Sequence, residues 1–328
     1  VLLGWNITTS MLVGGGIVLF YTILGGMWSV TVTDIIQFVV MTIGIFFIML
    51  PMSISKADGW ENLLTQLPQT HFSFASIGYQ QIFQYFLLYA LGMVVSQDIW
   101  QRVFTAKSNK IARNGSIFAG FYSIAYALAG SIIGMCAFIV IPSISNPQNT
   151  FAEMALAILP SGILGLVLAS VCSALMSTAS GTLLASATLI TNDILKQYFM
   201  KNMTDRQLLR ASRITTLIVG LIAITFSIWI QDVLVALDVA YAILSGAIFI
   251  PLVMTFFWKK ATPNAGFYSI LVSTVVVLAG LFFEGLTSTN PIIYGMSSGF
   301  IVLVGISYLT NYRKKTGNVE YLKETKQL

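Results

Sequence analysis

Apolar residues gather in long runs along the chain, and shorter polar segments separate the runs. Each run is long enough for an α-helix to cross the hydrocarbon core of a bilayer. Strand-like alternation of apolar and polar residues is absent, and unpaired backbone groups are not tolerated in hydrocarbon, so helices are expected. We predict an all-α membrane protein with nine transmembrane helices, over residues 8–27, 32–55, 81–97, 114–142, 161–190, 212–230, 235–257, 264–284 and 290–311.

The composition supports a lipid environment. Of 328 residues, 56% are hydrophobic and 9% are charged, whereas soluble domains carry roughly 25% charged residues. A soluble protein of this composition would have too few polar side chains to cover its surface. The lipid bilayer is therefore an expected partner.

Basic residues mark one side of the expected membrane protein. If the chain changes sides at every run, sixteen of the 17 basic residues share one side and only Lys56 lies opposite. Because Lys and Arg accumulate on the cytoplasmic face, we expect a multi-pass protein of the plasma membrane with residue 1 outside and a cytoplasmic C-terminus. The net charge of +5 then requires no nucleic acid.

Several classes of activity lack the residues they need. Cys136 and Cys172 lie inside apolar runs, and the only histidine, His71, lies in an expected outer loop. A disulfide framework, a Cys-rich metal site and a His cluster are therefore not expected. The chain has no GxxxxGK[ST] phosphate-binding loop, which argues against ATP-driven transport. We expect neither an enzyme nor an organic cofactor.

The run 161–190 carries an unusual number of hydroxyl groups. Single Ser and Thr residues in membrane helices usually bond to their own backbone or help helices to pack. A dense stripe at mid-membrane can instead offer hard oxygen ligands to a hard cation such as sodium. The stripe and its flanks comprise Ser170, Ser173, Ser177, Thr178, Ser180, Thr182 and Thr191.

The acidic residues Asp34 and Asp238 lie within the runs. Asp34 falls near the inner end of 32–55 and Asp238 near the outer start of 235–257. An Asp in the first turn of a helix suits the helix dipole and caps free N–H groups. A carboxylate inside a membrane is also a functional candidate. For Asp34 both interpretations stay open, and for Asp238 we favour a first-turn dipole or gate role.

Four blocks of sequence resemble the sodium:solute symporter family, whose members carry proline, pantothenate, sialic acid and sugars. The order and spacing of the blocks match, and the resemblance covers residues 4 to about 312. The blocks are Tyr21–Ser29 with its Gly25-Gly26 pair, Thr33–Gln37, Ala174–Ser180 and, more weakly, Asp98–Arg102.

The resemblance implies a LeuT-type core of two inverted repeats, with solute and ions bound near broken helices at the midplane. The first two runs resemble the end of repeat one, the next five repeat two, and the last two peripheral helices. Because the chain opens at Val1 without Met, we expect the first core helices to be missing. We expect a partial transmembrane domain at 1–312, a cytoplasmic basic tail at 313–328, and a broken helix near Gly92.

The resemblance also implies two sets of sodium ligands. The first is the carbonyl of Ala174 with the hydroxyls of Ser177 and Thr178. A second set, present in some members, would use Asp34 with Ser177 and Ser180. The position of its third hydroxyl is Gly181 here, which leaves the number of sodium ions open.

Residues in the third and seventh runs resemble solute contacts of the family. They are Tyr89, Tyr241 and Ser245, for which ordinary packing is the alternative. The resemblance implies sodium-coupled symport of a small polar organic solute by alternating access, with sodium as the coupling ion. A proton-coupled carrier or channel of related core, or a transporter-like sensor, is the alternative. The solute and the oligomeric state leave no signal in the sequence.

Overall fold

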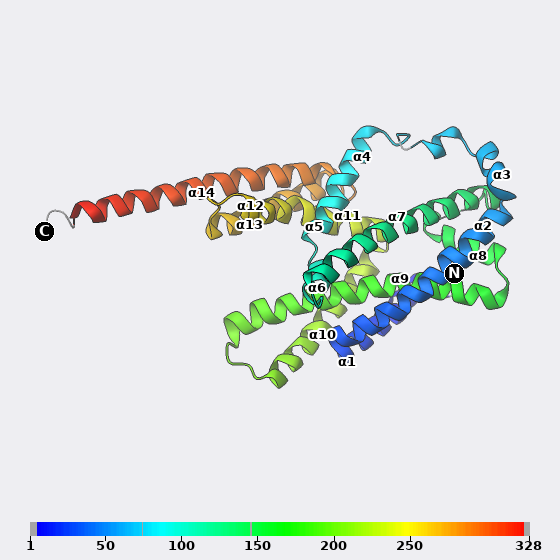
Figure 1. The fold of residues 1–328 in the computed structure, drawn as a ribbon, viewed down its shortest axis with the longest axis horizontal. Helices are drawn as coiled ribbons and strands as arrows, with labels where there is room; N and C mark the ends of the chain where they lie inside the picture. Colours follow the sequence, from blue (N-terminus) through cyan, green and yellow to red (C-terminus); the bar gives the residue numbers. More distant parts are fainter. Residues whose placement is uncertain (1–4, 74, 145, 325–328) are drawn as a thin grey trace. The chain divides into compact units, whose positions relative to one another are not determined.

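The computed structural model describes residues 5–73, 75–144 and 146–324, with side chains up to residue 311. These residues form helices joined by turns, without a strand among them (Figure 1). They divide into two compact units. The first contains residues 1–76 and 100–231, and the second contains 77–99 and 232–328. The expected all-α fold is therefore confirmed.

The first unit is built around three long helices, α1, α9 and α10, which pack against one another. Its elements in chain order are α1 (Ile7–Thr42), the π-segment η1 (Ile43–Met49), α2 (Leu50–Lys56), α3 (Gly59–Gln66), the 3-10 turn η2 (Gln69–Phe72), α7 (Asn109–Val140), the 3-10 turn η4 (Pro147–Asn149), α8 (Thr150–Ile158), α9 (Ser161–Thr188), the π-segment η5 (Leu189–Phe199) and α10 (Asp205–Ile230). Helix α6 (Gln97–Phe104) leads into this unit.

A break at Gly26 divides α1 into two arms. Gly26 has φ 54° and ψ −145°, which is not helical and which glycine adopts without a Cβ penalty. Both arms lie against α9: the Tyr21 hydroxyl donates to the Met176 carbonyl at 3.1 Å, and the Ser177 hydroxyl donates to Asp34 at 2.6 Å. The break therefore brings two stretches of α1 onto one neighbouring helix.

The same break explains why the number of spans differs from the expected nine. Eight helical segments of the described chain are long and apolar enough to cross a membrane, and the first, Ile7–Lys56, has 50 residues. A straight helix of that length would measure about 75 Å, against roughly 30 Å of hydrocarbon. The expected runs 8–27 and 32–55 are the two arms on either side of Gly26.

Apolar packing holds α2, α7 and α8 together in the first unit. Met49, Cys136 and Met154 are fully buried in this cluster, which is mostly aliphatic and also contains Phe46, Phe72, Tyr126 and Phe151. Burial of this kind stabilises the contact through close van der Waals packing, since lipid is as apolar as the side chains. This cluster supports η1 and α2, which continue the second arm beyond α1, through almost entirely apolar contacts.

The second unit contains the remaining helices. They are α4 (Tyr79–Tyr85), the π-segment η3 (Phe86–Ala90), α5 (Leu91–Val95), α11 (Val233–Ile243), the π-segment η6 (Leu244–Ile248), α12 (Phe249–Phe257), α13 (Pro263–Glu284) and α14 (Asn290–Glu324). Helices α13 and α14 lie side by side (Figure 1). The Ser269 hydroxyl donates to the Gly299 carbonyl at 2.7 Å across this contact. The side chains of the expected tail, 313–328, lie outside the described residues.

The break expected near Gly92 lies at Ser96 instead. Gly92 is inside α5, whereas Ser96 has ψ 119° and separates α5 from α6. The Ser96 hydroxyl bonds to the Asp98 carboxylate, two residues into the chain that follows. Serine favours such local bonds over a continuous helix, so the sequence around Ser96 stops α5 there.

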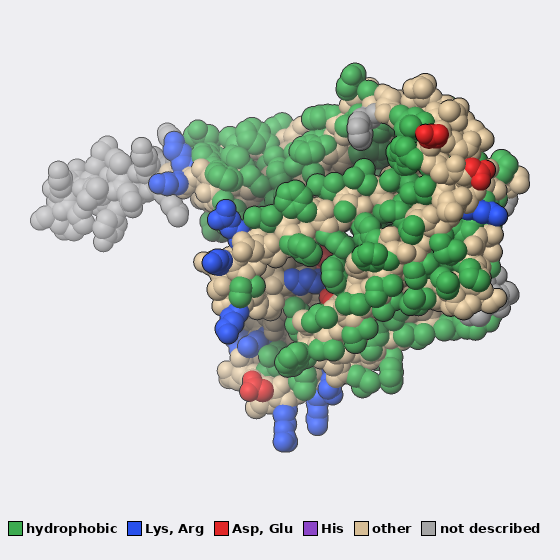
Figure 2. Space-filling model, turned by 45° about the vertical axis from the view of Figure 1, so that its right-hand side comes forward, with side chains coloured by type: hydrophobic (Ala, Val, Ile, Leu, Met, Phe, Trp, Pro, Cys, Tyr) green, Lys and Arg blue, Asp and Glu red, His purple; other side chains and the backbone are tan. Residues whose placement is uncertain are grey.

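Large hydrophobic side chains cover much of the surface (Figure 2). Phe257, Phe282 and Phe283 each expose more than 80% of their area. An apolar surface of this extent would be unstable in water but is compatible with lipid.

Candidate ion and solute sites

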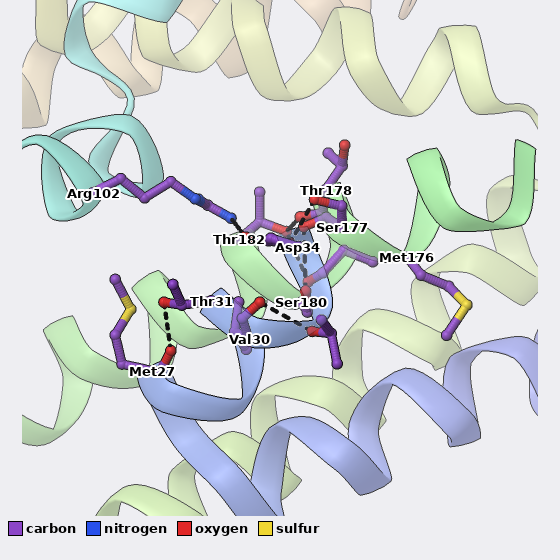
Figure 3. A network of polar contacts seen from close by, with 12 residues as sticks. Met27, Val30, Thr31, Asp34, Arg102, Met176, Ser177, Thr178, Ser180 and Thr182 are labelled. Atoms are coloured by element: carbon purple, nitrogen blue, oxygen red, sulfur yellow. Dashed lines mark hydrogen bonds and ion pairs between the residues drawn. The ribbon is translucent and has the colours of Figure 1, made fainter. Parts of the chain in front are cut away.

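Asp34 is the centre of a polar cluster in the first unit. Its Oδ1 accepts a hydrogen bond from the Ser177 hydroxyl of α9 at 2.6 Å, and its Oδ2 pairs with Arg102 Nη2 of α6 at 3.0 Å. Figure 3 shows the Arg102 side chain reaching toward Asp34 from the side opposite Met176. Side chains from three helices therefore meet at one carboxylate.

The structure excludes the first-turn cap interpretation of Asp34. The arm that carries Asp34 begins after Gly26, and Asp34 lies about two turns farther along. Both of its oxygens bind side chains of other helices. Asp34 is thus a partner in tertiary contacts within the unit.

The oxygen atoms of the predicted first set of sodium ligands converge only in part. The Thr178 hydroxyl donates to the Ala174 carbonyl at 3.2 Å, so these two oxygens are in contact one turn apart on α9. The Ser177 hydroxyl faces Asp34 instead. Ser177 is shared by the two predicted sets, and its hydrogen bond links the Ala174–Thr178 turn to the carboxylate.

Most of the remaining hydroxyl stripe supports the packing interpretation. The Ser180 hydroxyl, which is fully buried, donates to the Ser177 carbonyl at 3.2 Å. Ser170 donates to the Val167 carbonyl at 2.5 Å in the same way. These bonds stay within α9, as is usual for hydroxyls in membrane helices. Ser177 differs because its bond crosses to another helix.

Arg102 was missed as a site residue by sequence reasoning. An ideal Cβ placed on Gly181 would lie 2.5 Å from Arg102 Nη2 and 2.7 Å from Nη1. The guanidinium therefore lies against the bare backbone of α9 at Gly181. The Asp98–Arg102 block and the glycine at a hydroxyl position were both visible in the sequence, but nothing in the sequence indicated that they meet.

A second carboxylate cluster lies in the second unit. The Tyr89 hydroxyl of η3 donates to Asp238 Oδ1 of α11 at 2.6 Å. The rings of Tyr89 and Tyr241 pack edge to face with centroids 5.3 Å apart. Tyr89 and Tyr241, which were predicted as solute contacts, are therefore neighbours, and Tyr89 binds Asp238.

Ser245, the third predicted solute contact, uses its hydroxyl in a packing contact between helices. It is fully buried, and its hydroxyl donates to the Leu88 carbonyl at 2.5 Å. An ideal Cβ on Gly92 would lie 2.5 Å from Tyr241 Cδ1 and 2.9 Å from Ser245 Oγ. Gly92 thus allows α5 to approach these two residues closely.

Asp238 does not lie in the first turn of α11, so the expected dipole role is wrong, and the gate role stays a prediction. The N-cap of α11 is Asp232, whose side chain accepts from the backbone N–H groups of Leu234 and Val235 at 2.9 and 3.1 Å. Asp238 lies in the second turn and binds Tyr89 instead.

Comparison with known proteins identifies the family to which the chain belongs. The model of the family described as "SSF: Sodium:solute symporter family" matches residues 1–273. The chain belongs to the sodium:solute symporter family. A sodium/proline symporter of Staphylococcus aureus is 28% identical over 318 residues, covering 92% of this chain. The chain spans 61% of the length of that relative.

A solved structure of a Na+-coupled sialic acid symporter, substrate-bound and outward-open, shares the fold. It aligns with a TM-score of 0.76 over 93% of this chain and 67% of its own, at 19% sequence identity. The LeuT-type fold class that the sequence resemblance implied is thereby confirmed. The family is one of transporters rather than enzymes, and the eight apolar helices of the described chain support a multi-pass membrane protein.

Proposed function

We propose that the protein is a secondary active transporter that couples movement of a small polar organic solute to sodium by alternating access. The observation that carries this proposal is the oxygen cluster between the α1 arm and α9, where Ser177 binds Asp34 at 2.6 Å beside the Ala174–Thr178 turn. A desolvated cation needs such oxygens to replace its hydration shell. Membership of the sodium:solute symporter family adds the class of coupling ion.

The first sodium ion would bind at Ala174, Ser177 and Thr178. Their spacing puts a carbonyl and two hydroxyls on adjacent positions of one helix face. Because the Ser177 proton is directed to Asp34, the oxygen lone pairs of Ser177 remain available to a cation. The Thr178 hydroxyl would turn away from the Ala174 carbonyl, so that both oxygens could face the ion.

Asp34, Ser177 and Ser180 would form a second cation position. The carboxylate supplies the charge, and Ser177 connects this position to the first site. The solute region would include Tyr89 and Tyr241, where two aromatic rings and a hydroxyl-bound carboxylate offer both stacking and polar contacts. Ser245 would shape this region from behind.

The basic residues support a cytoplasmic C-terminus in the plasma membrane, with residues 1–312 as the transmembrane domain and 313–328 as a basic tail. Within the first unit, Arg213 Nη2 donates to the Leu24 carbonyl at 3.3 Å, next to the Gly26 break. Lys56 lies at the far end of the other arm, about 45 Å from the break if the arm is straight. This separation supports a position of Lys56 on the side opposite the basic connections.

Single cysteines at positions 65, 108 and 320, in a background without Cys136 and Cys172, test the sidedness. An impermeant thiol reagent added to intact cells should label position 65 and leave 108 and 320 unlabelled. Labelling of position 108 from outside would overturn the proposed topology.

Transport itself is tested with the protein expressed from its complete reading frame and reconstituted in proteoliposomes. Radiolabelled uptake is measured for a panel of small polar solutes, including proline and sialic acid, under a sodium gradient and under a matched potassium gradient. We expect uptake of at least one solute only with sodium. Uptake driven equally by a proton gradient without sodium would favour the proton-coupled alternative.

A further inference from the structure

We propose that the Arg102 guanidinium is a tethered cation that occupies the second cation position, so that the protein binds one sodium ion and not two. The inference rests on the proposed sodium coupling and concerns the occupant of the position formed by Asp34, Ser177 and Ser180. It makes Arg102 the residue that sets the sodium stoichiometry.

Arg102 contacts the carboxylate that a second ion would use, at the position where the third hydroxyl of that site is replaced by Gly181. Nη2 lies 3.0 Å from Asp34 Oδ2, while the other carboxylate oxygen accepts the Ser177 hydroxyl. The guanidinium also lies against α9 at Gly181. One positive group thus lies at the carboxylate and beside the helix that supplies the hydroxyls.

Charge balance argues for a single cation at this carboxylate. The Asp34 side chain is 22% exposed and that of Arg102 is 39% exposed. A carboxylate that is largely removed from water is stabilised by one compensating positive charge, and an arginine side chain carries such a charge in proteins. With Arg102 paired to Asp34, a sodium ion at the same carboxylate would add a second positive charge within a few ångströms of the first. Like charges at that distance repel, and the repulsion grows as the surroundings exclude water.

Gly181 provides the space that the guanidinium needs. Any side chain there would start with a Cβ 2.5 Å from Nη2 and 2.7 Å from Nη1, closer than van der Waals contact allows. Arg102 can therefore take up this place only because position 181 has no side chain. Gly162 and Gly165 on the same helix have no atom near an added Cβ, so the close approach is specific to Gly181.

The Arg102–Asp34 pair also prepares the first sodium site. The paired carboxylate accepts the Ser177 proton and so directs the lone pairs of Ser177 away from Asp34. A tethered cation performs this task permanently, whereas a second sodium ion would do so only when bound. The arrangement couples one ion to the carrier and keeps its binding oxygens oriented in the absence of that ion.

Direct binding of ²²Na+ to the purified protein, expressed from its complete reading frame, tests the inference without knowledge of the solute. The wild type should bind one sodium ion per chain with a Hill coefficient near 1. Arg102→Met, which removes the charge and keeps an unbranched apolar side chain, should bind two. Gly181→Ala should displace the flexible guanidinium and allow a second ion to bind more weakly.

Matched variants control for the change of residue type. Arg113→Met removes an exposed arginine of α7, and Gly165→Ala adds a methyl group to α9 where nothing lies within 4 Å. Both should bind one ion, as the wild type does. Asp34→Asn combined with Arg102→Met removes both charges and should return the count from two to one.

Two ions bound by the wild type, or one ion bound by both Arg102→Met and Gly181→Ala, would overturn the inference. If Arg102→Met does not fold, as judged by size-exclusion chromatography, Gly181→Ala carries the test because its new methyl group meets only a flexible side-chain end. Sodium-driven uptake by a wild type that binds two sodium ions would refute only the tethered-cation inference and would leave the proposed function intact. Absence of sodium binding and of sodium-dependent uptake would refute the proposed function.

Discussion

The two units each contain a carboxylate held by a hydroxyl from another helix, and the surroundings of the two carboxylates differ. Asp34 accepts from Ser177 and Asp238 accepts from Tyr89, both at 2.6 Å. Asp34 is also paired with the guanidinium of Arg102. Asp238 is instead bound by a tyrosine whose ring packs against a second tyrosine, Tyr241.

The different surroundings of the two carboxylates suit two different kinds of ligand. Hydroxyls and carbonyls beside a neutralised carboxylate suit a small hard ion, because they replace water without adding charge. Aromatic rings beside a carboxylate suit a larger organic solute, which gains from stacking and from a polar anchor. The two glycines near the clusters differ in the same way: Gly181 faces a flexible guanidinium, whereas Gly92 faces a ring and a buried hydroxyl.

The largest effect is expected for Ser177→Ala and Thr178→Ala. Each variant removes a proposed sodium ligand, so the sodium concentration for half-maximal uptake should rise by about tenfold to a hundredfold, as for the loss of a bond to a charged group. Uptake by the reconstituted protein as a function of sodium concentration measures this change. Ser186→Ala, whose hydroxyl bonds to the Thr182 carbonyl at 2.9 Å, should behave as wild type. A sodium response equal to that of Ser186→Ala would assign the hydroxyl stripe to helix packing.

The second-largest effect is expected for Gly92→Ala, and it distinguishes Gly92 from Gly181. Gly92→Ala forces a Cβ to within 2.5 Å of the Tyr241 ring and should lower the free energy of unfolding by about 1–3 kcal/mol, as overpacking does. Gly181→Ala should cost less because the guanidinium can move. Thermal unfolding in detergent measures both, with Gly266→Ala as the control, since nothing lies within 4 Å of its added Cβ. Equal stability of Gly92→Ala and Gly266→Ala would contradict the close approach of α5.

Asp34→Asn should have a smaller effect on sodium. Asn keeps the shape but leaves Arg102 without its counter-charge, so the sodium concentration for half-maximal uptake should rise by roughly threefold to tenfold. Partial exposure of the pair, at 39% and 22%, keeps this below the cost of breaking a fully buried pair. Asp193→Asn, at an exposed position of η5, serves as the control. An unchanged sodium titration would remove Asp34 from the ion site.

The smallest effect is expected at Tyr89. Tyr89→Phe removes one hydrogen bond to Asp238 and should raise the KM for the solute by about twofold to tenfold, while the sodium response stays unchanged. Combination with Asp238→Asn should add little further, because one change removes the bond that the other weakens. Tyr79→Phe, at a residue that is 80% exposed on α4, is the control. Additive effects of the two changes would show that the hydrogen bond is not shared in the functional protein.

The sequence predicted the helices well because membrane spanning is a local property. Apolar runs and the absence of strand alternation follow from residues that are close in sequence. The Asp34–Ser177 association was also expected, through the resemblance to the family. The breaks were harder to place. The break was expected near Gly92. Gly92 instead allows close packing inside α5, and Ser96 ends that helix.

Amino-acid sequence by itself determined that this chain is a multi-helix membrane protein of the sodium:solute symporter family with a hydroxyl-rich helix. Tertiary structure decided which polar groups meet. Arg102 is 68 residues from Asp34 in the chain, and Tyr89 is 149 residues from Asp238. The hydropathy of a segment depends only on residues that are close in the sequence. An ion pair depends on how distant segments pack and on whether a neighbour such as Gly181 leaves room for it.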